Sequence, residues 1–529
     1  MKRNAAYSFF KKSSMLINMR RLTQALFLLI FLWLFLQTES KGANELGYPV
    51  KIFLDADPLI FITTTLSAHQ FYSSFLLVLI VILATGLLGR VFCGWICPLG
   101  TLHNMTGSLK KQRLSAKPYS GYRWKYYILI FLLVSSVFTL QLVGIMDPIS
   151  LLIRSLSLAV YPLIQYATAS VFNTLYAWHL PVVTDLSEAI YALLKKGFLS
   201  FQQPFFRQAV SIGLLFFGIL ALNFLEKRFW CKYLCPLGAL LGFFSKYALL
   251  NRSVSEDCNE CGVCRRTCQG DAVPDQKGKW RKTECMFCMN CDDPCPQKAV
   301  RFGFSTTTAG AALDLGKRRV IGSIFSGMIV ASLLKVTPLA RAGTADPKLI
   351  RPPGSLEEKE FLKRCVKCGE CMKVCITNGL QPTLWEAGVE GIWSPLLVPR
   401  IGYCEYRCTL CGQVCPTGAI KKLMPEEKEK TKIGLAMIDK GRCLPYAHAT
   451  SCIVCEEVCP TPKKAIWFEE VRVKNRAGKV LIVKQPRVDL DLCIGCGICE
   501  NKCPVLGQPA IYVTSIGESR SKDNQLLLP

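Results

Sequence analysis

The chain has 529 residues, of which 51% are hydrophobic, with a mean hydropathy of +0.28 and a formal net charge of +26. This much apolar sequence is unusual for a soluble protein and predicts membrane spans. The charge does not indicate nucleic-acid binding, because residues 1–342 carry 37 Lys and Arg against 17 Asp and Glu, mostly beside apolar runs. There the positive-inside rule accounts for them, so we expect a lipid membrane and no nucleic acid as a partner.

Apolar runs alternate with basic segments through the first half of the chain. Residues 22–38 are the first predicted membrane helix, following six Lys and Arg and no acid; a cleaved secretory signal is the alternative. Three further runs are predicted to span: 71–89, 126–146 and 208–225. For residues 147–204, interfacial helices, re-entrant helices and two further spans all stay open. The positive-inside rule places three basic segments on the cytoplasmic side: 1–21, 90–125 and 226–319.

The same two-cysteine element follows two of these runs. Residues 92–100 read FCGWICPLG and residues 230–238 read WCKYLCPLG, so both contain C-x3-C-P-L-G. Two thiols are too few for a complete cluster or zinc site. We therefore expect the two copies to converge and to hold one [4Fe–4S] cluster jointly; a redox-active dithiol pair and a structural zinc are the alternatives. The cysteines concerned are Cys93, Cys97, Cys231 and Cys235.

Eight cysteines between residues 258 and 295 form two C-x2-C-x2-C-x3-C runs. In two-cluster bacterial ferredoxins the first three thiolates of such a run bind one [4Fe–4S] cluster and the fourth reaches the other. Structural zinc sites use two separated C-x2-C knuckles instead, so the spacing predicts two clusters. The expected ligand sets are Cys258, Cys261, Cys264 with Cys295, and Cys285, Cys288, Cys291 with Cys268.

Sixteen cysteines after residue 343 form four more groups and predict four [4Fe–4S] clusters in two ferredoxin-like units. Two groups have irregular first gaps, so the fourth ligand of each cluster stays open. The groups are Cys365, Cys368, Cys371 and Cys375; Cys404, Cys408, Cys411 and Cys415; Cys443, Cys452, Cys455 and Cys459; and Cys493, Cys496, Cys499 and Cys503. Between the last two, residues 465–486 predict two short strands around an Asn-Arg-Ala-Gly turn.

These features predict a polytopic α-helical membrane domain joined to α+β ferredoxin-like domains of the bacterial 2×[4Fe–4S] type. The expected domains are a membrane domain with at least four helices (1–250), a cytoplasmic two-cluster ferredoxin (251–305), a transmembrane segment (317–342) and an extracytoplasmic four-cluster domain (343–529). Lys317-Arg-Arg319 and Ala340-Arg-Ala342 are similar to a twin-arginine signal with its cleavage site. An ordinary span is the alternative, and cleavage after Ala342 stays open.

Ionisable residues near the predicted membrane are candidates for proton handling. Asp147 and Arg154 lie near the outer end of the 126–146 run, and His103 follows the first C-x3-C-P element. Simple capping of a helix is the alternative role for Asp147. Haem is not expected, because there is no C-x-x-C-H site and the four histidines are predicted to lie in loops.

The cysteine motifs resemble those of the quinol-dehydrogenase module of periplasmic nitrate reductase. Residues 1–300 are similar to its membrane subunit (NapH-type), with two C-x3-C-P motifs, a two-cluster ferredoxin and Asp147-Pro-Ile-Ser150 where the family has Asn-Pro-Val-Ser. Residues 317–529 resemble its exported subunit (NapG-type), including the twin arginines and Arg351-Pro-Pro-Gly354. The chain therefore resembles a fusion of two subunits that are normally separate chains.

The resemblance implies a multi-pass iron–sulfur electron-transfer protein of the bacterial cytoplasmic (inner) membrane, with its C-terminal domain outside the cytoplasm. It implies quinol dehydrogenase activity, with quinone as substrate and electrons passing between the menaquinone or ubiquinone pool and an extracytoplasmic redox partner protein such as a multihaem cytochrome or a reductase. The cysteine groups predict six [4Fe–4S] clusters and a seventh at the paired C-x3-C-P motifs. A metal-centre maturation or copper-handling factor and a relay fed by cytoplasmic ferredoxin are the alternatives.

Overall fold

The computed structural model describes residues 13–40, 44–70, 75–109, 120–178, 181–200, 202–273, 280–305, 315–336, 346–474 and 478–525. The chain forms two compact units, each assembled from segments that are far apart in the sequence. The first unit contains Met1–Phe35, Ile52–Leu152 and Gly213–Leu333; the second contains Leu36–Lys51, Ile153–Ile212 and Leu334–Pro529. The expected 1–250 domain is thus divided between both units. The Ala340–Ala342 triplet lies outside the described residues.

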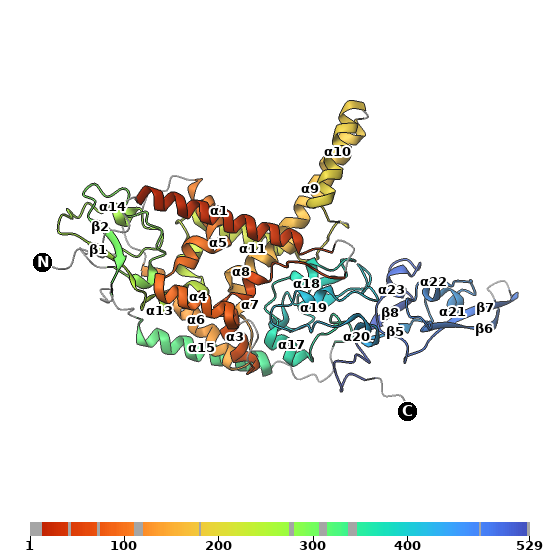
Figure 1. Ribbon diagram of the computed structural model, residues 1–529. Helices are drawn as coiled ribbons and strands as arrows, with labels where there is room; N and C mark the ends of the chain where they lie inside the picture. Colours follow the sequence, from red (N-terminus) through yellow and green to blue (C-terminus); the bar gives the residue numbers. More distant parts are fainter. Residues whose placement is uncertain are drawn as a thin grey trace. The chain divides into compact units, whose positions relative to one another are not determined.

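Helices build most of the first unit and follow the apolar runs of the sequence (Figure 1). The first are α1 (Ser13–Gln37), α2 (Ile52–Asp55), α3 (Pro58–Ala68), α4 (Phe75–Leu88), the π-helical turn η1 (Phe92–Ile96) and α5 (Pro98–Ser108). Next come η2 (Ser120–Arg123), α6 (Trp124–Val137), α7 (Val143–Met146) and α8 (Pro148–Ser155). The later ones are α11 (Ala209–Ala221), η4 (Leu222–Phe224), α12 (Phe229–Tyr233), α13 (Pro236–Ser245) and α15 (Lys317–Val336).

Four of these helices start in the same way, with a proline at the first helical position and a capping side chain just before it. Proline fits there because the N–H that it lacks would have no intrahelical partner. Helices α3 and α8 are capped by Asp57 and Asp147, and α5 and α13 by Cys97 and Cys235. The C-P-L-G sequence is therefore a helix start that directs a thiol against the first backbone N–H groups of the helix.

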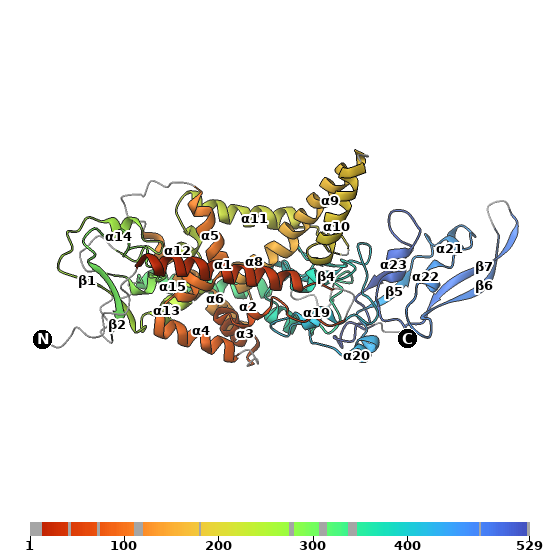
Figure 2. The same cartoon turned by 45° about the horizontal axis from the view of Figure 1, so that its top comes forward.

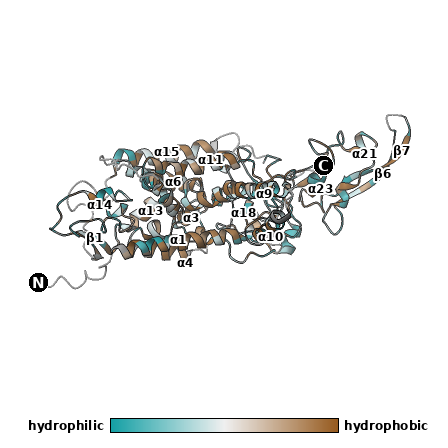
Figure 3. Ribbon diagram, turned by 90° about the horizontal axis from the view of Figure 1, so that it is seen from above, coloured by the Kyte–Doolittle hydropathy of each residue, from teal (hydrophilic) through white to brown (hydrophobic). Residues whose placement is uncertain are grey.

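The core of the first unit lies between α3, α4, α6 and α13, which pack together in both views (Figures 1 and 2). Leu59, Leu132 and Leu241 are buried there. Other faces of the helices stay apolar although they are exposed, as Leu29 on α1 and Leu214 on α11 illustrate, and Figure 3 shows hydrophobic colour along these helices. Exposed apolar surface of this extent is typical of contact with lipid or with another protein.

A small α+β region completes the first unit. Strands β1 (Leu250–Val254) and β2 (Val300–Phe304) pair antiparallel, and α14 (Val263–Arg266) and η5 (Lys282–Glu284) lie between them in the sequence. Its core contains Trp280, Phe287 and Phe302, whose rings meet edge to face. The long connection between β1 and β2 contains the eight cysteines of the predicted two-cluster ferredoxin.

The second unit contains a helical hairpin. Helix α8 continues through the π-helical turn η3 (Leu156–Val160) into α9 (Tyr161–Ala177), and α10 (Pro181–Gly197) packs along α9. Tyr161 and Gln165 both donate to the carbonyl of Phe198, which fixes the end of α10 beside the start of α9.

The remainder of the second unit is built from short elements around cysteine loops. Its helices are α17 (Glu358–Arg364), α18 (Glu370–Lys373), η6 (Val389–Gly391), α19 (Leu410–Gln413), α20 (Pro425–Lys430), α21 (Leu444–Ala447), α22 (Val454–Glu457) and α23 (Ile498–Lys502). Its antiparallel strand pairs are β3 (Leu380–Pro382) with β4 (Pro395–Leu397), β5 (Leu435–Ile438) with β8 (Ile511–Thr514), and β6 (Ile466–Lys474) with β7 (Val480–Val488). The β6–β7 pair confirms the hairpin predicted within 465–486, with strands of nine residues each.

Among the described residues, two helices are long and apolar enough to cross a membrane: Met15–Gln37 and Pro148–Ala177. The other predicted runs form helices α4, α6 and α11 of 14, 14 and 13 residues, fewer than the roughly 20 that a bilayer requires. The 126–146 run is interrupted after Val137, where Thr139 has a positive φ of 63°. The polytopic arrangement therefore stays a prediction.

Candidate functional site

All sixteen cysteines after residue 343 line four cavities in the second unit. Each cavity is bordered by three thiols from one cysteine group and a fourth from another. We name them site I (Cys365, Cys368, Cys371, Cys415), site II (Cys404, Cys408, Cys411, Cys375), site III (Cys443, Cys452, Cys455, Cys503) and site IV (Cys493, Cys496, Cys499, Cys459).

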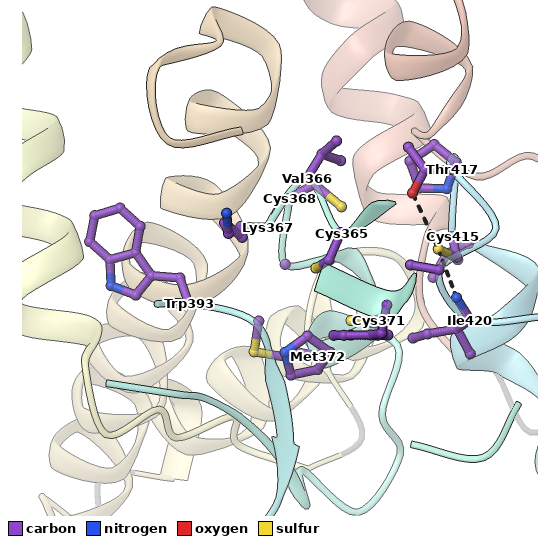
Figure 4. Close-up of a pocket in the computed structure, with 16 residues that line it drawn as sticks. Cys365, Val366, Lys367, Cys368, Cys371, Met372, Trp393, Cys415, Thr417 and Ile420 are labelled. Carbon is purple, nitrogen blue, oxygen red and sulfur yellow. Dashed lines mark hydrogen bonds between the residues drawn. The ribbon is translucent and has the colours of Figure 1, made fainter. Parts of the chain in front are cut away.

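Site I illustrates how the chain builds such a cavity (Figure 4). Cys365 and Cys368 lie in the loop before α18, and Cys371 lies on that helix. Cys415 approaches from the end of α19, where its Sγ accepts a hydrogen bond from the backbone N–H of Ile420 at 3.4 Å and faces Thr417 Oγ1 at 3.9 Å. Four thiols from two loops thus surround one space.

The short helices explain why the fourth cysteine of each group leaves its own cavity. Cys371 and Cys375 are separated by about one helical turn at α18, and Cys411 and Cys415 by one turn at α19. The third cysteine of each group lines one cavity and the fourth lines the neighbouring one. Sites III and IV exchange cysteines in the same way across α22 and α23. The cavities therefore indicate which fourth cysteine belongs to each site, a point that the sequence left open.

The two pairs of sites are joined through sites II and IV. The backbone N–H of Cys404 donates to the carbonyl of Cys496 at 2.8 Å. The buried ammonium of Lys428 lies beside Cys404, Cys411 and Cys496. The sites therefore follow one another in the order I, II, IV, III.

The chemistry of these cavities fits a [4Fe–4S] group. Burial raises the pKa of Cys408, Cys455 and Cys496 to about 12, so these thiols need a bound cation to stay ionised at neutral pH. Backbone N–H groups point at some of the sulfurs, as Ala510 N–H does at Cys503 Sγ (3.4 Å). Such donors lower the charge on cluster sulfurs. Each cavity takes three thiols from one cysteine group and the fourth from another, as in two-cluster ferredoxins, whereas structural zinc sites use two separated C-x2-C knuckles.

In the first unit the two C-x3-C-P elements have the same local geometry. The N–H of Gly100 donates to Cys97 Sγ at 3.4 Å, and that of Gly238 donates to Cys235 Sγ at 3.3 Å. The N–H of Cys97 bonds the carbonyl of Phe92, and that of Cys235 bonds the carbonyl of Trp230, both at 2.9 Å and five residues back. The sequence repeat is therefore a structural repeat.

The two repeats bring their thiols together. Cys97 lies within electrostatic range of Cys93 and Cys231, and Cys235 within range of all three other thiols. Cys97 and Cys235 are buried, and the other two are partly exposed. The two repeats therefore lie near each other in the first unit. Among the described residues, no group of three or more His, Cys, Asp or Glu side chains is arranged as a metal site, so the joint cluster stays a prediction.

Buried cations surround these four thiols. Arg90 lies beside Cys93 and Cys235, and Arg228 beside Cys97 and Cys231. Both guanidinium groups are at most 1% exposed, and in the described part of the chain Nε and Nη2 of each have no hydrogen-bond partner. Unpaired buried donors of this kind fit a bound group of negative charge, such as an iron–sulfur cluster held by four thiolates. Sequence reasoning missed both arginines, although each stands three residues before the first cysteine of its repeat.

The predicted ferredoxin packs directly on the first C-x3-C-P element. Trp95 Nε1 donates to the carbonyl of Phe287 at 3.1 Å, and a Cβ added at Gly94 would lie 2.2 Å from the carbonyl oxygen of Met286. Only a glycine permits so close an approach. Arg228 also reaches Met286, with Nη1 to Sδ at 3.1 Å. Since Met286 and Phe287 lie between Cys285 and Cys288, the loop that carries these two cysteines packs against the first C-x3-C-P element.

A buried ionic network holds this contact in place. Glu284 accepts from Lys125 Nζ, from Tyr126 Oη at 2.7 Å and from Arg90 Nη1 at 3.5 Å. Cys268 lies near Cys285 and Cys291, its partners in the second predicted ligand set, and that set stays a prediction. The set of Cys258, Cys261, Cys264 and Cys295 stays a prediction.

The three residues proposed for proton handling lie in different settings. Asp147 is fully buried and caps α8, with Oδ2 accepting from the N–H groups of Ile149 (3.0 Å) and Ser150 (2.8 Å). Arg154, in the last turn of α8, donates to the carbonyl of Lys367 (3.1 Å) and stacks on Trp393 at 4.4 Å, at the edge of site I. The prediction that His103 lies in a loop is wrong: it lies on α5, where Nδ1 is 2.6 Å from Asn223 Nδ2.

Outside the four cavities, a partly buried ion network joins Arg351, Glu358 and Arg520. Arg351, which is 0% exposed in its side chain, donates Nη2 to Glu358 Oε1 at 2.6 Å, and Arg520 Nη1 donates to Glu358 Oε2 at 2.9 Å. Burial on its own would raise the pKa of Glu358, but the two guanidinium groups outweigh it and lower the pKa to about 2. The stabilisation is therefore complete above the unfolded-state pKa of about 4.3 and is lost as the pH falls towards 2.

Glu358→Gln should lower the free energy of unfolding of the second unit by about 3 kcal/mol at pH 7, because it leaves buried arginines without a counter-charge. The difference from the wild type should narrow as the pH falls below about 4.3. Anaerobic urea unfolding, followed by cluster absorbance, measures it. Glu429→Gln is the control, because its partner Arg407 is 70% exposed, and a change of at most about 0.5 kcal/mol is expected. Equal effects of the two variants would contradict the prediction.

Buried sets of four thiols, in direct succession and flanked by cations and backbone N–H groups, are the site of an iron–sulfur electron-transfer protein. Comparison with known families agrees. Residues 70–116 and 208–255, which contain the two C-x3-C-P elements, match a model described as a 4Fe-4S binding domain, and residues 486–506 match another with the same description.

Individual relatives point to the same class. YccM of Escherichia coli (strain K12), described provisionally as an electron transport protein, is 27% identical over 234 residues, which is 42% of this chain and 54% of YccM. The methylamine utilization ferredoxin-type protein MauM of Methylorubrum extorquens is 38% identical over 125 residues (23% and 55%). The ferredoxin-type protein NapG of Escherichia coli (strain K12) is 32% identical over 135 residues (25% and 58%). The chain thus covers a little over half the length of each. No solved structure matches it.

Proposed function

We propose that this iron–sulfur protein is a quinol dehydrogenase of the bacterial cytoplasmic membrane, which passes electrons from menaquinol or ubiquinol to an extracytoplasmic redox protein. One observation carries the proposal: the two C-x3-C-P repeats lie near each other in an apolar helical unit, and Gly94 of the first repeat packs against Met286, which lies between Cys285 and Cys288. A cluster held by these repeats would lie between an apolar helical unit and the predicted ferredoxin, where it could accept single electrons from a lipid-soluble two-electron donor.

Exposed apolar side chains support a membrane location for the first unit. Large apolar residues lie on the outward faces of α1, α4 and α11, and two helices are long and apolar enough to span. The multi-pass topology, the export of the second unit after exposed Arg318 and Arg319, and the likeness to a fused NapH- and NapG-type pair are parts of this proposal.

The second unit supports a directional relay. Arg154 connects site I to the apolar helix Pro148–Ala177, whereas site III is at the other end of the series, beside the β6–β7 hairpin. Electrons would enter at site I, pass through sites II and IV, and leave from site III. A partner such as a multihaem cytochrome or a reductase would then dock near Cys443 and Cys452.

The residues of the chain would tune and protect these centres. A [4Fe–4S] cluster supplies one-electron transfer when it is bound. Arg90, Arg228 and the N–H groups of Gly100 and Gly238 would stabilise the additional negative charge at the C-x3-C-P site, which raises its reduction potential. Burial of Cys97 and Cys235 keeps water from the sulfurs.

Redox-titrated EPR with iron analysis of the purified full-length protein tests the function. Seven clusters of four irons correspond to about 28 irons per protein. Addition of menaquinol under anaerobic conditions should reduce a fraction of them, and dithionite should reduce more. Clusters that dithionite reduces but menaquinol leaves oxidised would overturn the quinol dehydrogenase role. About two irons or fewer per protein would overturn the relay itself.

A further inference from the structure

Two aspartates of the first unit, distant in the sequence, meet at the starts of two helices. Asp57 caps α3, with Oδ1 accepting from the N–H of Leu59 at 2.7 Å, and Asp147 caps α8. Each stands immediately before a proline, in Asp57-Pro58 and Asp147-Pro148. Both side chains are 0% exposed, and the two carboxyls are near enough for the charge of Asp147 to act on Asp57.

The remaining oxygens of this pair have no donor from the described chain. Asp57 Oδ2 and Asp147 Oδ1 are both buried without a hydrogen-bond partner. The backbone N–H groups of Leu59 and Ile60 donate to Asp57 Oδ1, and those of Ile149 and Ser150 donate to Asp147 Oδ2. The buried hydroxyl of Ser150 makes no hydrogen bond within the described part of the chain. Two ionised carboxylates cannot lie side by side in such a place, because both are acceptors and their charges repel. A single proton between them satisfies both oxygens and removes half the charge.

We propose that Asp57 and Asp147 share one proton and that this pair is the internal proton acceptor for the hydroquinone that the protein oxidises. The inference rests on the proposed function and adds a second residue, Asp57, to its proton-handling site. An ionisable pair buried among apolar helices is costly to keep unless it has such a use. Helix capping alone does not require an aspartate at either position, because asparagine caps a helix as well as aspartate does.

The step balances as follows. Oxidation of one hydroquinone to the quinone breaks two O–H bonds and releases two electrons and two protons. The two electrons would be taken up one at a time by oxidised iron–sulfur clusters, the chemistry that such groups supply when bound. One proton converts the carboxyl–carboxylate pair into two carboxylic acids, and the other leaves to water. Loss of the extra proton to water restores the pair for the next turnover.

Two readouts on the full-length protein in lipid nanodiscs test the proposal, with Asp57→Asn and Asp147→Asn as variants. Both should fold, because the N-cap hydrogen bonds persist. Infrared spectroscopy should show the carbonyl band of a protonated, buried carboxylic acid in the wild type at neutral pH, and either variant should lose it. Menaquinol should reduce the clusters of either variant about 100-fold more slowly, whereas dithionite should reduce them fully. Asp346→Asn is the control, since exposed Asp346 also bonds a backbone N–H, that of Lys348.

The outcomes separate this inference from the function on which it rests. A wild type without the band, or variants that both keep it, would overturn the shared proton. Variants reduced by menaquinol at the wild-type rate would overturn the acceptor role and leave the quinol dehydrogenase function standing. A wild type that menaquinol does not reduce would overturn that function and the acceptor role together, while the infrared band would still decide whether the pair shares a proton.

Discussion

Cys93→Ser is expected to remove about four irons from a total of about 28, together with one EPR signal, and to leave the other clusters loaded. The reason is that Cys93 belongs to a set of four thiols that the two C-x3-C-P repeats bring together, so the loss of one thiol removes a quarter of the coordination. Cys231→Ser should have the same effect, because the repeats place Cys93 and Cys231 in equivalent positions. Menaquinol-driven reduction should fall at least tenfold in both.

The matched control for these variants is Ser108→Ala, on the exposed side of α5, which should keep the full iron content. A structural zinc would give a different result: zinc analysis of the wild type would find about one ion per protein, and Cys93→Ser would lose it without loss of iron. A dithiol pair would leave both metals unchanged. Either result would contradict the seventh cluster and its place in the relay.

Combining cysteine substitutions should reveal which thiols share a cluster in the second unit. Cys415→Ser with Cys365→Ser should cost about four irons, no more than either substitution alone, because both thiols border site I. Cys415→Ser with Cys404→Ser should cost about eight, because Cys404 borders site II. Non-additivity of this kind reports membership of one unit.

Cys375→Ser supplies the reciprocal case. It lies in the same sequence group as Cys365 but borders site II, so it should combine additively with Cys365→Ser and non-additively with Cys404→Ser. Iron analysis and spin quantitation of dithionite-reduced samples measure both. If Cys375→Ser instead added nothing to Cys365→Ser, each group would ligate its own cluster, and the exchange of ligands between sites would be wrong.

The ligand types and their local spacing were predictable from the sequence. Three cysteines at C-x2-C-x2-C spacing can reach one centre because a loop followed by one helical turn directs them inward, as Cys365, Cys368 and Cys371 show. The irregular gap between Cys443 and Cys452 did not prevent assembly, since α21 fills it and returns the chain to site III. The hairpin after Ile466 was also predictable, because alternation and a turn signal are local properties.

Other parts of the site depend on contacts between distant segments. Asp57 had no signal of its own, because a single Asp-Pro is a common helix start, and only packing placed it against Asp147. The sequence predicts Arg90 and Arg228 to be basic residues at the cytoplasmic ends of apolar runs. In the structure both are buried beside cysteine thiols. Residues 126–146 were predicted to form one membrane-spanning helix, but the helix ends at Val137, close to Thr139 with its positive φ.

The sequence by itself determined that this is an iron–sulfur protein with a repeated C-x3-C-P element, because cluster ligation depends on residue type and short-range spacing. The tertiary structure alone decided which fourth cysteine completes each site, that sites II and IV adjoin, and that two aspartates share one buried position. The two aspartates are 90 positions apart (147 − 57), Cys404 and Cys496 are 92 apart (496 − 404), and the fourth cysteines come from another loop. These features depend on how helices and loops pack, which no local pattern encodes.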